Sequence, residues 1–150
     1  MKKERNIALA VCAVFAALIL LLTSQSSPLY PINLWGDANC LFTVGRVMKD
    51  GGVLYRDIYE QKGPLLYLIH ALAACLSDTS FWGVYIMEAL AMTVALYAAY
   101  RLMRLRAGMG FSLGAAAFFG AAFASCTAFI RGDSAEEFCL PLLMAALAIA

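Results

Sequence analysis

The sequence predicts an all-α membrane protein that crosses the bilayer several times. Of its 150 residues, 63% are hydrophobic and only 14% are charged, whereas an average soluble domain is roughly half apolar and a quarter charged. The apolar residues are gathered in long runs, with shorter polar stretches between them. We therefore expect about three complete transmembrane helices, a fourth that is incomplete, and an outer loop that carries interfacial helices: residues 7–23, 80–103, 111–130, 138–150 (incomplete) and 24–79 (outer loop).

The first apolar run covers residues 7–23 and contains no charged residue. At 1.5 Å per residue it is about 25 Å long, which is enough to cross a bilayer with slight thinning. A cleaved signal peptide has the same layout, although residues 23–30 show no clear small-x-small cleavage site. Because Lys2, Lys3 and Arg5 precede the run, we expect a cytoplasmic N-terminus and an outer position for the residues that follow.

A short amphipathic helix is predicted between Asp37 and Asp50. Polar residues recur at the spacing of one helix face, and apolar residues recur on the other face: Leu41, Val44 and Met48. Such a helix is expected to lie on the membrane surface. The two glycines that follow Asp50 favour the left-handed conformation in which many helices end.

The next apolar stretch, residues 65–76, is too short to span a bilayer and is typical of a re-entrant or interfacial helix. Pro64 precedes it, and proline is tolerated best in the first turn of a helix. If this stretch stays outside, the arginines that follow the second span lie in the cytoplasm, as the positive-inside rule favours: Arg101, Arg104 and Arg106. If the stretch crosses, those arginines face outward. We favour the first arrangement.

The third apolar run, residues 111–130, has a small residue at every fourth position: Ala116, Gly120, Ala124 and Ala128. Such a stripe lets another helix approach closely. The last run, residues 138–150, is too short to span. We therefore expect the chain to be the N-terminal part of a longer protein, with one membrane domain; a truncated, inactive remnant is the alternative.

The composition argues against nucleic-acid binding. The net charge is +1, and no tract of lysine and arginine with interleaved aromatic residues is present. The five cysteines stand singly, so neither a metal cluster nor a disulfide framework can be recognised. The sequence identifies no cofactor, and a divalent metal stays open. The partner that the composition predicts is the lipid bilayer.

Asp37 is the first candidate for chemistry. It follows a segment with Tyr30 and Trp35, residue types that are enriched at membrane interfaces, so it would stand at the outer mouth of the helical bundle. A carboxylate there can act as a general base toward a hydroxyl group. The structural alternative is that Asp37 is the N-cap of the helix that it begins.

Lys62 is the second candidate, because it precedes the helix expected to start at Pro64. Its ammonium and the free backbone N–H groups of the first helical turn would point at the same place. This arrangement predicts an anion site at headgroup depth that suits a lipid phosphate. The alternative is a lysine that extends its ammonium to the interface without binding a ligand.

The other charged residues are possible site residues with structural alternatives. Glu88 lies within the second span, where an unpaired charge costs on the order of 3 kcal/mol. We expect it to face other helices and to find its partner in a missing part of the protein. Arg56 and Asp57, together with Glu60, are expected to form a solvated and partly paired surface set. The role of Asp133 stays open.

Two motifs are expected to be structural. His70 is the only histidine and is expected to pack within the helix at residues 65–76. Ser134 and Glu137 have the spacing of a capping box before an apolar run, so Glu137 is expected to support the start of that helix.

The arrangement resembles the N-terminal part of C-type (GT-C fold) membrane glycosyltransferases, in the family 39-like group that includes protein O-mannosyltransferases and bacterial aminoarabinose transferases. The resemblance is carried by Asp37, by the block GRVMKDGGVLYRDIYEQKGPLLYLIHAL at residues 45–72, and by Asp133. It implies that Asp37 is the catalytic base or orients the acceptor, and that Lys62 contacts the phosphate of the sugar donor. Ala38 departs from the family pattern, in which many members have an acidic residue at this position.

The resemblance implies an enzyme that transfers a sugar from a polyprenyl-phosphate donor to a hydroxyl acceptor, with inversion, at the extracytoplasmic face of the cell membrane. The competing class is a non-enzymatic multi-pass membrane protein, such as a transporter or a lipid-binding fragment. A transporter is expected to have broken helices that meet near the bilayer midplane. Here the polar residues are densest at the expected outer interface, which favours the transferase.

Overall fold

A computed structural model describes residues 2–129 and 131–149 of the chain. The described residues form six α-helices and no strand, apart from one isolated bridge between Leu54 and Ile58. The prediction of an all-α protein is therefore confirmed. The helices are α1 (Lys2–Thr23), α2 (Gly36–Lys49), α3 (Pro64–Leu76), α4 (Trp82–Met103), α5 (Met109–Ala124) and α6 (Ala135–Ile149).

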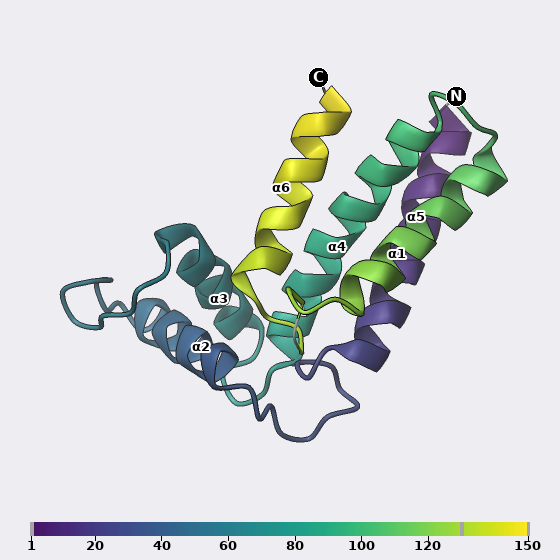
Figure 1. Cartoon of the computed structure of the whole chain (residues 1–150). Helices are drawn as coiled ribbons and strands as arrows, with labels where there is room; N and C mark the ends of the chain where they lie inside the picture. Colours follow the sequence, from purple (N-terminus) through teal and green to yellow (C-terminus); the bar gives the residue numbers. More distant parts are fainter. Residues whose placement is uncertain (1, 130, 150) are drawn as a thin grey trace.

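The helices form two groups, which meet at α4. Helices α1, α4 and α5 pack side by side, and α6 runs along another side of α4 (Figure 1). Helices α2 and α3 pack against each other, and α3 also contacts α4. The N-terminus and the α4–α5 turn lie together at one end of the bundle, where Arg104 donates to Glu4 at 2.7 Å. The α5–α6 loop, which carries Asp133, lies at the other end of the bundle beside the end of α1 (Figure 1).

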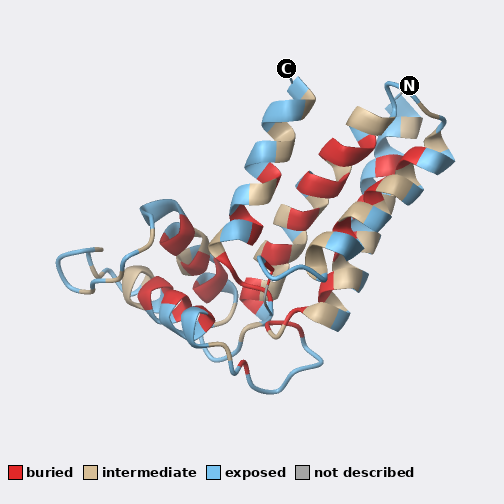
Figure 2. Ribbon diagram, viewed as in Figure 1, coloured by how far each residue is buried: buried red, intermediate tan, exposed pale blue. Residues whose placement is uncertain are grey.

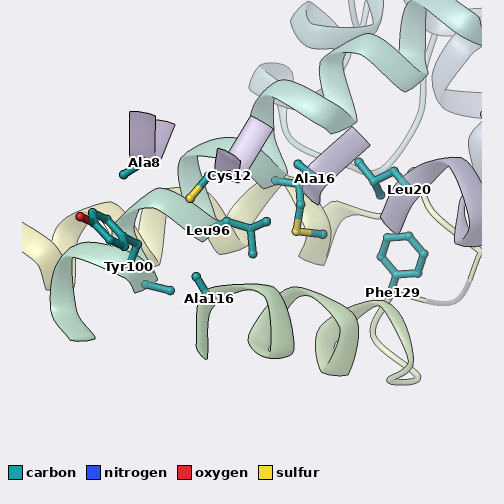
Figure 3. Close-up of a cluster of buried hydrophobic side chains, with 10 residues drawn as sticks. Ala8, Cys12, Ala16, Leu20, Leu96, Tyr100, Ala116 and Phe129 are labelled. Carbon is teal, nitrogen blue, oxygen red and sulfur yellow. The ribbon is translucent and has the colours of Figure 1, made fainter. Parts of the chain in front are cut away.

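The core between α1, α4 and α5 is built on small residues. The buried residues of α1 recur every four positions, so they form one line along the helix: Ala8, Cys12, Ala16 and Leu20. Leu96 of α4 and Ala116 of α5 face this line (Figure 3). The opposite side of α1 is exposed and strongly apolar, with Leu22 68% exposed (Figure 2). A face of this kind is favourable against lipid and unfavourable in water.

Two helices of the described residues, α1 and α4, are long and apolar enough to cross a membrane. This finding indicates an association with membrane. The expected third span is shorter than predicted, because α5 ends at Ala124 and residues 125–129 form turns. Its 16 residues reach about 24 Å, which crosses the roughly 30 Å hydrocarbon core only where the bilayer thins. Helix α6 has 15 residues and contains Pro141. A third or fourth crossing stays a prediction.

The small-residue stripe of α5 lets this helix pack closely against α1 and α4, as the sequence predicts. Ala116 and Gly120 are buried, and a Cβ added at Gly120 would lie 2.7 Å from Leu96 Cδ2 and 3.1 Å from Ile19 Cδ1. Ala128 lies beyond the end of the helix. The stripe therefore contributes through its first half, where α5 packs against α1 and α4.

Gly120→Ala is expected to lower the stability of the chain by about 1–3 kcal/mol, because the added methyl group overfills this contact. Gly114→Ala is the matched control in the same helix, since a Cβ there meets nothing within 4 Å. The control is expected to raise stability by up to about 1 kcal/mol through helix propensity. Thermal unfolding of the purified chain in detergent measures both, and equal shifts would contradict the close packing.

The two short helices of the outer loop begin and end close to the predicted positions. Helix α2 ends at Lys49, and Gly51 follows with φ +93°, the left-handed conformation that glycine favours. Pro64 is the first residue of α3, which has 13 residues. The apolar face of α2 packs on α3 through Leu41 and Val44, which contact the cluster around Tyr67. This face is therefore covered by protein, whereas the sequence predicts a helix lying on the membrane surface.

Candidate functional site

Three of the predicted site residues line one small cavity of about 80 Å³: Asp37, Lys62 and Asp133. They come from the first turn of α2, from the residue before the N-cap of α3, and from the loop between α5 and α6. The other lining residues are Trp35, Leu41, Ser134, Ala135 and Glu136. Since a water molecule occupies about 30 Å³ in the liquid, this cavity holds a small polar group rather than a whole sugar. We call it the acidic pocket.

Asp37 lies in the first turn of α2 and is exposed. The N-cap hypothesis for this residue is wrong, because α2 begins at Gly36 and its N-cap is Trp35, with no side-chain cap hydrogen bond. The Asp37 carboxylate has no hydrogen bond or ion pair with another described residue. A negative charge is favourable in the first turn of a helix, and this carboxylate is free to accept a proton from a ligand.

Lys62 is half-buried, and none of the ion pairs among the described residues involves its ammonium. The backbone N–H groups around it are less available than expected. The N–H of Lys62 donates to Glu60 and to the Tyr67 hydroxyl, at 3.2 and 2.6 Å. Pro64 has no N–H, and the N–H of Leu66 donates to the Gly63 carbonyl. The N–H groups of Gly63 and Leu65 have no hydrogen-bond partner among the described residues, so an anion here would be bound by the side chain of Lys62 together with these two groups.

An apolar groove of about 250 Å³ adjoins the acidic pocket. It lies between α3 and α6 and is lined by Lys62, Gly63, Pro64, Leu65, Leu66, Ile69, Ala135, Phe138, Cys139 and Leu142. Lys62 and Ala135 line both cavities. Lys62 therefore lies where an apolar channel meets a pocket lined by three carboxylate residues, and it is the only cationic residue among those that line either cavity. A ligand with a hydrocarbon tail fits the channel, and Lys62 supplies the positive charge for an anionic headgroup.

Asp133 is completely buried and has a left-handed backbone, with φ 56°. Its N–H donates to Glu88 Oε1 at 2.6 Å and to Glu137 Oε2 at 2.9 Å. Gly132 before it also has a positive φ, and a Cβ there would collide with Ser24 and Glu88. A left-handed aspartate is uncommon and costs on the order of 1–3 kcal/mol. The surrounding contacts hold it in this conformation at the wall of the pocket.

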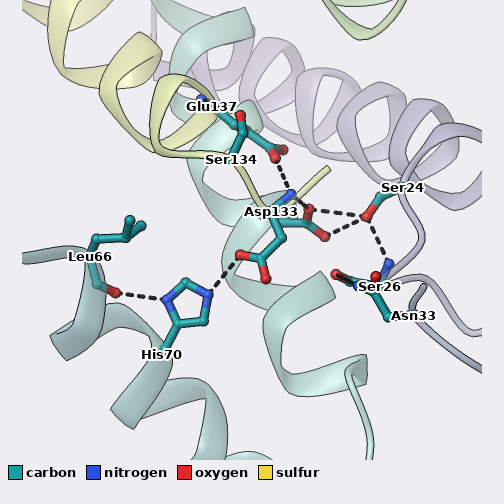
Figure 4. Close-up of polar contacts among 9 residues, drawn as sticks. Ser24, Ser26, Asn33, Leu66, His70, Asp133, Ser134 and Glu137 are labelled. Atoms are coloured by element: carbon teal, nitrogen blue, oxygen red, sulfur yellow. Dashed lines mark hydrogen bonds and ion pairs between the residues drawn. The ribbon is translucent and has the colours of Figure 1, made fainter. Parts of the chain in front are cut away.

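Glu88 is completely buried in α4. The Ser24 hydroxyl donates to its carboxylate, with oxygen distances of 3.0 and 2.8 Å, and the backbone of Asp133 supplies a second donor (Figure 4). The expectation that its partner lies in a missing part of the protein is therefore wrong. Glu88 faces other helices, as predicted, and it ties the end of α1 to the loop before α6.

His70 is completely buried on α3, and each of its ring nitrogens has a partner (Figure 4). Nδ1 lies 2.8 Å from the Leu66 carbonyl oxygen, and Nε2 lies 2.7 Å from Asp133 Oδ1. Burial by itself lowers the pKa of His70, but the Asp133 carboxylate and these hydrogen bonds raise it above its ordinary value. The sequence predicts the packing of His70 and does not reveal this contact.

One half of the predicted capping box is present, because Ser134 Oγ accepts from the N–H of Glu137 at 3.1 Å. In the other half, the Glu137 carboxylate accepts from the N–H of Asp133, one residue before the N-cap, instead of from the N–H of the N-cap residue Ser134. Glu137 is therefore structural, as predicted, and it also fixes the backbone of Asp133.

Arg56 and Asp57 lie outside the acidic pocket. Arg56 donates to Asp57 at 2.8 and 2.7 Å, and both residues are exposed. The pair fits the expected surface role. Glu60 accepts from the Tyr67 hydroxyl. Burial works to raise the pKa of Glu60, but the Tyr67 hydroxyl and nearby N–H groups outweigh it and lower that pKa. Glu60 thus holds the segment before α3, next to Lys62.

A larger cavity of about 580 Å³ lies elsewhere. It is lined by residues 26–33 (without 29), Asn39 and residues 79–82, none of which is charged. It therefore supplies no carboxylate base and no cationic side chain for a phosphate, whereas the acidic pocket has both.

The described residues contain no group of three or more His, Cys, Asp or Glu side chains that is arranged to hold a metal ion. Comparison of the chain with models of protein families, with curated proteins and with solved structures found no match.

Proposed function

We propose that the chain is part of a membrane glycosyltransferase that transfers a sugar from a polyprenyl-phosphate donor to a hydroxyl acceptor. The observation that carries this proposal is the position of Lys62, between the apolar groove and the acidic pocket with Asp37 and Asp133. A polyprenyl-phosphate sugar has the same order of parts: an apolar tail, an anionic phosphate and a hydroxylated sugar.

In the proposed reaction, the tail lies in the groove and Lys62 binds the phosphate. Asp37 takes the proton of the acceptor hydroxyl as its oxygen bonds to the anomeric carbon. The bond between this carbon and the phosphate oxygen breaks, and its electron pair leaves with the phosphate. Lys62 stabilises the negative charge that the phosphate gains. Attack opposite to the leaving group inverts the anomeric centre.

The test is a titration of the complete protein with a long-chain polyprenyl phosphate and with the uncharged polyprenol of equal length. Trp35 lines the acidic pocket, whereas Trp82 lines a separate cavity of about 580 Å³. The part of the fluorescence change that persists in Trp82→Phe and is lost in Trp35→Phe therefore reports on the acidic pocket. We expect saturable binding of the phosphate, with an affinity about tenfold or more above that of the alcohol.

A transfer assay then separates the enzyme from the competing class. Polyprenyl-phosphate mannose and polyprenyl-phosphate aminoarabinose, each labelled in the sugar, are incubated with the protein and with membranes that supply acceptors. Loss of label from the donor supports the transferase. Binding without loss of label would identify a non-enzymatic lipid-binding protein, and absence of both would overturn the proposal.

The proposed orientation puts the acidic pocket outside the cytoplasm. In a variant without native cysteines, Tyr59→Cys is expected to react with an impermeant maleimide in intact cells, and Leu105→Cys only after permeabilisation. The two positions match as probes, because Tyr59 is 78% and Leu105 is 77% exposed. The reverse pattern would invert the topology and place the pocket in the cytoplasm.

A further inference from the structure

His70 and Asp133 form a buried pair whose proton content follows from its geometry. The Leu66 carbonyl oxygen can only accept a hydrogen bond. Since it lies 2.8 Å from Nδ1 of His70, this nitrogen carries a hydrogen. A neutral imidazole has one N–H, so its Nε2 would then present a lone pair toward Asp133.

The contact between Nε2 and Asp133 Oδ1 needs a second hydrogen. The two atoms lie 2.7 Å apart, and both side chains are completely buried. A lone pair facing an ionised carboxylate would be repulsive and would leave a net negative charge out of water, which is costly. With one proton between the two atoms the contact is a hydrogen bond, and the pair is neutral overall whichever atom carries that proton.

Among the described residues, the ring of His70 has no hydrogen-bond partner besides Leu66 and Asp133. The ring of Phe138 on α6 packs edge-on at a centroid distance of 5.9 Å, and Gly45 of α2 lies against the His70 backbone. Neither residue titrates. Glu88 and Glu137 reach the backbone N–H of Asp133. Asp37, Lys62 and Glu136 are the other charged residues that line the pocket with Asp133.

The second oxygen of Asp133, Oδ2, is buried and has no hydrogen-bond partner among the described residues. Nε1 of Trp35 is a buried donor that also has no hydrogen-bond partner among the described residues, and both residues line the acidic pocket. Buried polar atoms normally have partners. One unpaired acceptor and one unpaired donor at the same pocket complement a hydroxyl group, which both donates and accepts.

We propose that His70 and Asp133 hold one proton between them, and that His70 is a positioning residue that leaves Asp133 Oδ2 free to accept a hydrogen bond from a ligand hydroxyl in the acidic pocket. The shared proton is independent of the reaction. The assignment of the hydroxyl to the sugar of the donor rests on the proposed function.

NMR of the complete protein with ¹⁵N-labelled histidine tests the shared proton, and the signals that are lost in His70→Gln identify the ring of His70. We expect the ¹⁵N chemical shift of Nδ1 to be that of a protonated nitrogen, and the shift of Nε2 to differ from that of a nitrogen with a free lone pair. Both chemical shifts should stay constant across about pH 5–8, where an ordinary histidine titrates. In Asp133→Asn the ring should become neutral, with a lone pair on Nε2. Asp50→Asn is the control, because that side chain is 71% exposed. A lone-pair Nε2 in the unmodified protein would overturn the shared proton.

The positioning role is tested with His70→Phe and His70→Gln in the transfer assay. Phenylalanine removes both ring hydrogen bonds, whereas glutamine can still donate to Asp133. We expect His70→Phe to lower kcat by about 10- to 100-fold, the usual cost of losing an orienting partner, with unchanged affinity for polyprenyl phosphate. His70→Gln should recover part of the loss. Unchanged kcat in a folded His70→Phe variant, or equal losses in both variants, would overturn the positioning role.

If the unmodified protein transfers no sugar, the proposed function fails together with the hydroxyl assignment, and the NMR result still decides the shared proton.

Discussion

Replacing Asp37 by asparagine in the complete protein is expected to lower sugar transfer by about 10²- to 10⁴-fold, the usual contribution of a general base. Asparagine keeps the shape of the side chain but cannot take a proton from an acceptor hydroxyl at neutral pH. Asp37 is exposed and is not the N-cap of α2. The substitution is therefore expected to leave folding and membrane insertion unchanged. Transfer of labelled sugar from the polyprenyl-phosphate donor is the measurement.

Binding of polyprenyl phosphate is the internal control for this variant. We expect its affinity to stay the same or to rise slightly, because a negative charge beside the phosphate is removed. Asp50→Asn, at the other end of α2, should retain full transfer. A folded Asp37→Asn variant with normal transfer would exclude Asp37 as the base. A variant that does not accumulate would show that Asp37 is needed for the fold.

The sequence predicts the short helices of the outer loop well, because local chemistry sets their ends. Gly51 adopts the left-handed conformation after α2, and Pro64 begins α3. Both positions depend on backbone preferences of single residues, which can be recognised without tertiary information. The same reasoning fails for Asp37, since α2 begins one residue before it. Helix ends commonly differ by one or two residues, and this shift changes the interpretation of the side chain.

The end of α5 could not be predicted from hydropathy alone. Residues 125–130 are as compatible with a long apolar span as the helix before them, yet residues 125–129 form turns. Phe129 is buried there in the core with Leu20. Burial of this side chain against α1 thus accompanies an early end of the helix. Tertiary packing of this kind overrides local helix propensity.

The candidate site was predicted in part. The sequence provides Asp37, Lys62 and Asp133 as separate candidates, and the fold brings all three to one pocket. The contacts between His70 and Asp133, and between Ser24 and Glu88, join residues 63 and 64 positions apart. No periodicity connects such distant residues. A single buried histidine and a buried glutamate each require a partner, and only the packing of the helices identifies it.

Lys62→Ala in the complete protein is expected to weaken polyprenyl-phosphate binding by roughly tenfold to a hundredfold. This range corresponds to about 1.5–3 kcal/mol, the usual contribution of a hydrogen bond to a charged group. The loss should be partial, because the N–H groups of Lys62 and Leu66 are occupied whereas those of Gly63 and Leu65 have no hydrogen-bond partner among the described residues and can still donate to the phosphate. The fluorescence change assigned to Trp35, which persists in Trp82→Phe and is lost in Trp35→Phe, measures the affinity.

Three comparisons show whether Lys62 acts through its charge on the phosphate. Lys62→Arg should recover part of the affinity, since it keeps the charge but presents a planar fork in place of a compact ammonium. Lys49→Ala, which removes an ammonium paired with Asp78 at 2.8 Å, should bind like the unmodified protein. Affinity for the uncharged polyprenol should be equal in all variants, because the apolar groove is intact. If Lys62→Ala binds polyprenyl phosphate with unchanged affinity, its ammonium only extends to the interface, and the phosphate site lies elsewhere.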